Sequence, residues 1–185
     1  FLDRMLAQVY ELDDTATGFP TTHQVMSREA FTSFKNGSLL AIGVALLFLA
    51  LVLRSLGGFV IAALPLLVGE GWMLGILATA QIPFNYGNMI AIPLLMALAL
   101  DYGVWFAHRR TELESLGPWQ VIRVAGIPIL LAALTTLAGL GAITFASYRA
   151  ISSLGLSVTI GLLCCLACAL FISPAVAQLL DWRRK

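Results

Sequence analysis

Charged residues are scarce in this sequence. They make up 11% of its 185 residues, whereas about 25% is usual in a soluble domain. With 59% hydrophobic residues, this scarcity excludes an ordinary soluble globular domain. The formal net charge of +1 gives no sign of a nucleic-acid partner, and we expect none.

The residues that build metal, disulfide and hydrolase sites are also few. Cys164, Cys165 and Cys168 lie inside one apolar run with no His or acidic residue nearby in sequence. We interpret them as small packing residues and predict neither a metal site nor a cofactor. An intramembrane hydrolase would need a His or a second Asp within the apolar runs, but His23 and His108 lie outside them. We therefore expect no enzyme.

The opening stretch lacks an initiator Met and a signal peptide. We interpret the chain as a fragment of a longer polypeptide. Residues 1–36 are mixed and polar, and the stretch from residue 27 to Gly37 is typical of a short amphipathic lead-in to a helix.

Long apolar runs dominate the rest of the chain. A helix of about 20 residues crosses a hydrocarbon core of about 30 Å. The sequence predicts an all-α membrane protein, a bundle of five transmembrane helices over residues 37–182 with a cytoplasmic tail at 183–185. The first run is short, and we expect the lead-in to extend it. The five runs are 38–53, 57–80, 87–107, 126–146 and 152–180.

Lys and Arg in the short connections predict the orientation. One set of alternate connections carries nearly all of them, whereas the other carries Arg149 alone. We therefore predict a cytoplasmic C-terminus and an extracytoplasmic segment at 1–36. In the largest inside loop we predict a short helix that begins at Pro118 and lies along the membrane surface. The basic residues of the first set are Arg54, Arg109, Arg110, Arg123, Arg183, Arg184 and Lys185.

Two carboxylates interrupt the predicted spans, Glu70 and Asp101. A charge near the bilayer centre costs about 2.5–3.5 kcal/mol on insertion scales. Ala or Leu would serve a purely structural purpose at either position. We therefore interpret both as ionisable groups that face a bundle interior or a water path.

Hydroxyl groups are predicted close to the level of Asp101. Thr135 and Thr136 can hydrogen-bond a carboxyl group, although a Thr in a membrane helix often bonds back to its own backbone. Tyr102 follows Asp101 directly, and neighbours on a helix point about 100° apart. Asp101 and Tyr102 therefore face different partners.

Several stretches resemble the resistance-nodulation-division (RND) transporter superfamily. These are "IPFNYGNMIAIPLLMALALDYGVWFAHRR", "ILLAALTTLAGLGA" and "SSLGLSVTIGLL". The branch they resemble is the MMPL-type lipid exporters, with the hopanoid-exporter-like proteins. The resemblance covers about residues 17–180 and follows the five-span order.

The resemblance implies that the chain is the five-helix part of one half of a duplicated transporter, and that residues 1–36 end an extracytoplasmic porter domain. Asp101 and Tyr102 match a proton-relay pair in which the Asp of one half faces the Tyr of the other. Thr135 and Thr136 match supporting hydroxyl residues. Glu70 departs from the pattern, and three roles stay open for it: a second titrating site, a substrate contact or a neutral structural acid.

The function predicted on this basis is export of lipids or other hydrophobic molecules across a bacterial inner membrane, driven by the proton-motive force. The expected partners are membrane lipids, the transported molecule and the other half of the transporter, and self-assembly is left open. Two alternatives are a sterol-sensing-like, lipid-binding regulatory module and a translocase-helper subunit of the same superfamily. A sensor would bind lipid with little response to pH.

Overall fold

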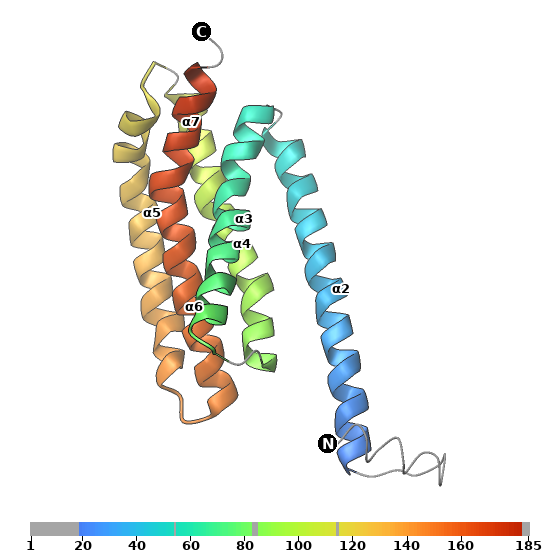
Figure 1. Ribbon diagram of the computed structural model, residues 1–185. Helices are drawn as coiled ribbons and strands as arrows, with labels where there is room; N and C mark the ends of the chain where they lie inside the picture. Colours follow the sequence, from blue (N-terminus) through green and yellow to red (C-terminus); the bar gives the residue numbers. More distant parts are fainter. Residues whose placement is uncertain (1–18, 54, 83–84, 114, 183–185) are drawn as a thin grey trace. The chain divides into compact units, whose positions relative to one another are not determined.

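The computed structural model describes residues 19–53, 55–82, 85–113 and 115–182 (Figure 1). Every regular element in these ranges is helical, and five helices are long and apolar enough to cross a membrane. This confirms the predicted fold class. The elements are α2 (Phe19–Leu53), α3 (Leu56–Thr79), α4 (Tyr86–Glu112), α5 (Pro118–Gly141), the 3₁₀ turn η1 (Ala142–Phe145), α6 (Arg149–Ala167), the π-helical turn η2 (Cys168–Ile172) and α7 (Ser173–Trp182).

The chain divides into two compact units, residues 1–39 and residues 40–185. In the first unit the described part is helical from Phe19 onward. The stretch from residue 27 to Gly37 is therefore part of α2. Residues 1–18, half of the predicted extracytoplasmic segment 1–36, lie outside the described residues.

The second unit is a bundle whose long helices run up and down beside one another (Figure 1). The last span is one nearly continuous path through α6, η2 and α7. The helices of the bundle pack through large buried apolar side chains, and van der Waals packing of this kind is what drives helices together in a membrane. The largest of these side chains are Leu49, Ile61, Leu66, Met73, Leu95, Phe106 and Leu162.

Two glycines set how closely the central helices approach. A Cβ atom at Gly103 of α4 would overlap the backbone of Ala62 on α3. A Cβ atom at Gly69 of α3 would stand 2.7 Å from the Cys165 sulfur on α6. Both contacts bring backbones together, which small residues permit in membrane helices.

Polar contacts tie the two ends of the bundle. At one end, the Asn85 side-chain amide donates to the Ser153 hydroxyl (2.9 Å), and the Ser153 hydroxyl donates to Asn88. At the other end, Arg110 at the close of α4 pairs with Asp181 at the close of α7. The loops therefore fall into two groups at opposite ends, as alternating spans require.

The fourth span begins earlier than the sequence predicted. The stretch from Pro118 was expected to form a separate surface helix, but it is the first part of α5. Val121 and Ala125 of this stretch are fully buried. Gln120 and Arg123 lower the local hydropathy, although a helix with one apolar face can still pack on the bundle.

Candidate functional site

Asp101 lies near the middle of its membrane span. The span runs from Asn88 to Glu112, longer than the predicted 87–107. At 1.5 Å per residue, Asp101 is about 16 Å from Glu112 rather than the roughly 10 Å that the shorter span implied. Its side chain is exposed on the surface of the bundle. A carboxylate at this depth and on this surface is costly to charge unless another group or water covers it.

The Asp101 side chain opens into a groove of ≈ 260 Å³ between α4 and α5. The groove wall is largely apolar; Asp101, Thr136 and Trp105 carry polar side-chain groups, and Tyr102 also lines the groove although its hydroxyl is buried. A hydrophobic groove with a few converging polar groups is a common form of binding site. The remaining lining residues are Leu98, Pro128, Ile129 and Ala132.

The two threonines differ in their relation to the groove. Both hydroxyls donate to the backbone carbonyl of Ala132, Thr135 at 2.9 Å and Thr136 at 2.8 Å. Only Thr136 is among the residues that line the groove. Its oxygen keeps lone pairs with which it can accept a hydrogen bond while it donates to the backbone. The Thr136 oxygen is therefore placed to accept a hydrogen bond from a protonated group in the groove.

Tyr102 is directed into its own bundle. It is 4% exposed, and it is among the residues that line the groove with Asp101. Among the described residues its hydroxyl has no hydrogen-bond partner. The side chains of Asp101 and Tyr102 thus face different surroundings, one the groove and the other the core. The pairing of Tyr102 with an Asp from another half stays a prediction.

Glu70 lies in the core, away from the groove. It is on α3, is 9% exposed, and its Oε1 atom finds no hydrogen-bond partner within the described part of the chain. The neighbouring Gly69 abuts Cys165 of α6. The structure therefore brings Asp101, Tyr102 and Thr136 together, and it separates Glu70 and Thr135 from their groove.

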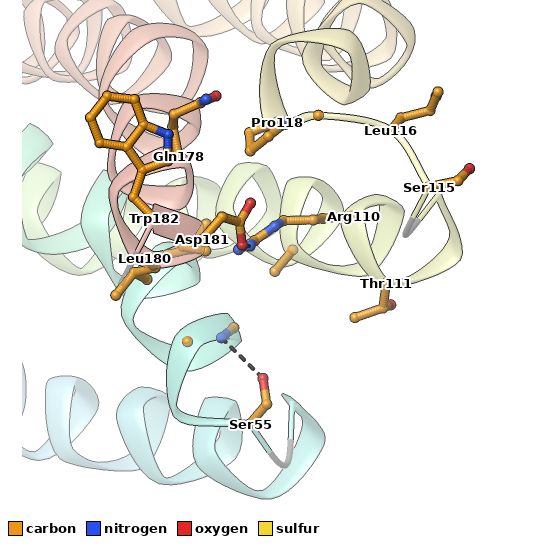
Figure 2. A pocket seen from close by; sticks show the side chains of 15 residues that line it. Ser55, Arg110, Thr111, Ser115, Leu116, Pro118, Gln178, Leu180, Asp181 and Trp182 are labelled. Carbon is orange, nitrogen blue, oxygen red and sulfur yellow. Dashed lines mark hydrogen bonds and ion pairs between the residues drawn. The ribbon is translucent and has the colours of Figure 1, made fainter. Parts of the chain in front are cut away.

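A second cavity, of ≈ 570 Å³, opens at the end of the bundle where α4 and α7 close (Figure 2). Arg110 and Asp181 meet on its wall, and Trp182 and Gln178 extend beside them (Figure 2). Sequence reasoning missed this cavity. Its charged pair joins residues 71 positions apart, and loop charges alone do not show which of them meet.

The helix ends around this cavity are capped locally. The Ser55 hydroxyl accepts a hydrogen bond from the Gly58 amide at the start of α3 (3.0 Å; Figure 2). Such a cap satisfies one of the free amides of the first turn and is worth about 1 kcal/mol. The guanidinium of Arg109 lies 5.2 Å from the Trp105 ring centroid and pairs with Glu112 (2.8 Å). The Ser55 cap marks the start of α3, and the Arg109 contacts lie within the last two turns of α4.

The three cysteines are buried and unbridged. In the ranges that the structure describes, no three His, Cys, Asp or Glu side chains gather in a way that could hold a metal ion.

The fold and the groove define a class of protein: a multi-pass helical membrane protein with an ionisable group at mid-membrane. Comparison with known proteins then names a relative. The chain is similar to the hopanoid transporter HpnN of Rhodopseudomonas palustris, with 26% identity over 176 residues. The match covers 95% of this chain and 20% of that protein, so the chain spans about a fifth of its relative's length. No family model matches. The similarity to HpnN confirms the resemblance to hopanoid-exporter-like RND transporters.

Proposed function

We propose that this chain is a transmembrane half of an RND-type transporter that exports lipids or other hydrophobic molecules. The export is driven by protons that bind Asp101. The name of the relative supports transport of a hopanoid or a similar lipid. The 26% identity leaves the transported lipid itself to experiment.

The groove around Asp101 carries this proposal. A mid-membrane carboxylate is expensive when charged, by about 2.5–3.5 kcal/mol on insertion scales. Proton binding removes that cost, so it changes which packing of the bundle is favoured. Proton binding can drive a conformational change only if one state of the bundle binds the proton more tightly than the other does.

The position of Asp101 on the bundle surface supports a second half as its partner. Exposed apolar side chains surround the groove on α4 and α5, including Trp105, Ile127 and Leu131. Lipid would cover these side chains but would leave the carboxylate without hydrogen bonds. A second bundle against the groove could supply polar groups and exclude lipid. The other half of the transporter is the partner that we propose.

The proposal is tested with Asp101→Asn in the protein that contains this chain. Asn keeps the size and polarity of Asp but cannot titrate. Reconstituted vesicles with an imposed pH gradient would be assayed for proton uptake and lipid export, and we expect both to be lost while membrane insertion stays normal. Substantial remaining uptake and export in the Asn variant would refute the role of Asp101.

Two rival functions predict other results in the same assay. A sterol-sensing-like module would bind lipid but move neither lipid nor protons, and its lipid affinity would be unchanged by Asp101→Asn. A translocase-helper subunit would show proton uptake that depends on a protein substrate rather than on lipid. The lipid-stimulated proton uptake of the unsubstituted protein therefore separates all three.

A further inference from the structure

A small polar cluster is enclosed between α3, α4 and α6. Its members are Glu70, Tyr102 and Cys165, which are 9%, 4% and 0% exposed. The Cys165 thiol lies within electrostatic range of both the Glu70 carboxyl and the Tyr102 hydroxyl. Neither the Glu70 Oε1 nor the Tyr102 hydroxyl is hydrogen-bonded to any described residue. Unsatisfied polar atoms are costly in a protein core and need an explanation.

The helix register shows how Glu70 and Tyr102 approach each other. Gly103 touches Ala62, so on the antiparallel helices α3 and α4 the residue level with Glu70 is Leu95. Tyr102 is seven residues further along α4 than Leu95, about 10 Å away along the axis. Side chains lean toward the N-terminus of their own helix. Because the two helices are antiparallel, Glu70 and Tyr102 lean toward each other across this interval.

Tyr102 links the core cluster to the groove. Tyr102 lines the groove together with Asp101, and its hydroxyl is buried within electrostatic range of Cys165. No Lys or Arg faces the cluster from the described helices that pack around it. α3 has none, α4 has Arg109 and Arg110 in its last turn, and α6 has Arg149 at its first residue. The other titratable groups nearby are Asp101, Cys164 and Cys168.

We propose that Glu70 is a second proton-binding site of this half, and that it loads Asp101 through the Tyr102 hydroxyl. The inference rests on the proposed function above. Glu70 gives up its carboxyl proton to the Tyr102 oxygen as the Tyr102 hydroxyl proton passes to the Asp101 carboxylate, both through bridging water, because the Tyr102 hydroxyl has no direct hydrogen bond to any described residue. Glu70 becomes a carboxylate, Asp101 becomes a carboxylic acid, and Tyr102 is unchanged.

Two polar side chains of α6, Ser153 and Ser157, lie between the Asn85 end of the bundle and the cluster. Ser153 belongs to the hydrogen-bonded group with Asn85 and Asn88 at the end of the bundle. Ser157, one turn further on, is fully buried, and its hydroxyl has no partner in the described structure. Cys165 follows two turns later, beside Glu70. Protons from the end that carries Asn85 therefore meet a polar side chain before they reach the cluster.

The first test measures proton uptake in vesicles that contain the complete transporter. Glu70→Gln and Tyr102→Phe keep the shape of each side chain but remove the titrating or relaying group. We expect each to slow uptake about a hundredfold, the low end of what a positioned proton-transfer group contributes. Glu112→Gln and Tyr148→Phe are the matched controls, because both residues are exposed, and they should leave uptake unchanged. Normal uptake by Glu70→Gln would overturn the proposal.

Asp101→Asn in the same assay separates this inference from the function on which it rests. Loss of uptake in Asp101→Asn but not in Glu70→Gln would refute the second site alone. Normal uptake in Asp101→Asn would refute the proposed function.

A further variant guards against a purely structural effect. Glu70→Asp keeps a titrating carboxyl group on a shorter side chain, so we expect this variant to retain more proton uptake than Glu70→Gln. Equal loss in the Asp and Gln variants would show that Glu70 acts through packing.

Infrared titration of the carboxyl band in the Asp101→Asn background gives a readout without transport. A band that titrates with pH and disappears in the added Glu70→Gln variant is expected, and its absence would also overturn the proposal.

Discussion

Arg110 and Asp181 form an ion pair that joins the end of α4 to the end of α7. Their side chains are 21% and 38% exposed, so water screens much of the attraction. The pair holds the last helix of the bundle against the third span, beside the larger cavity (Figure 2).

A double-mutant cycle on this pair should give a small coupling. We expect Arg110→Ala and Asp181→Ala to couple by about 0.5–1 kcal/mol, as partly exposed pairs do. Arg109 and Glu112 are a matched comparison, because they pair within one helix and are 40% and 43% exposed, and their coupling should be about 0.3 kcal/mol. Unfolding in mixed micelles measures both. A coupling of zero between Arg110 and Asp181 would mean that their ion pair adds nothing to the link between α4 and α7.

The two adjacent threonines should differ in function. Thr136 lines the groove with Asp101, whereas Thr135 does not. We expect Thr136→Val to slow proton uptake about fivefold, the equivalent of one hydrogen bond of about 1 kcal/mol. Thr135→Val should leave uptake unchanged, and Thr136→Ser should restore it. Equal rates for the two Val variants would exclude Thr136 from the relay.

The glycine contacts predict opposite effects on stability. Gly103→Ala should destabilise the bundle by about 1–3 kcal/mol, because the new methyl group overlaps the backbone at Ala62. Gly75→Ala is the control, since a Cβ atom there meets nothing within 4 Å. It should be neutral or stabilise the helix by up to about 1 kcal/mol. Thermal unfolding monitored by circular dichroism decides between them, and a neutral Gly103→Ala would contradict the close approach of α3 and α4.

The orientation in the membrane can be tested by labelling single cysteines with an impermeant maleimide. In a background with the three native cysteines replaced, Ala80→Cys lies at the end of α3 and Ser115→Cys in the loop before α5, both exposed. The charge distribution predicts that the reagent labels position 80 in intact cells and position 115 only after permeabilisation. Labelling of position 115 in intact cells would reverse the orientation.

Much of the fold was predictable because the bilayer leaves few choices. Long apolar runs must form helices whose backbone groups bond internally, and this determined the number and order of the spans. The boundary at Pro118 was missed because hydropathy averages over a whole helix. Val121 and Ala125 are buried on one face of α5, while Gln120 and Arg123 lower the average.

The sequence by itself determined that Asp101 and Glu70 lie within membrane spans, since a carboxylate inside a long apolar run has no other location. Only the tertiary structure decided what each faces. Asp101 opens into the groove beside α5, and Glu70 is enclosed near Cys165. The reason is that these surroundings come from helices distant in sequence, and packing between helices, such as the contact of Gly69 with Cys165, fixes their rotation and register.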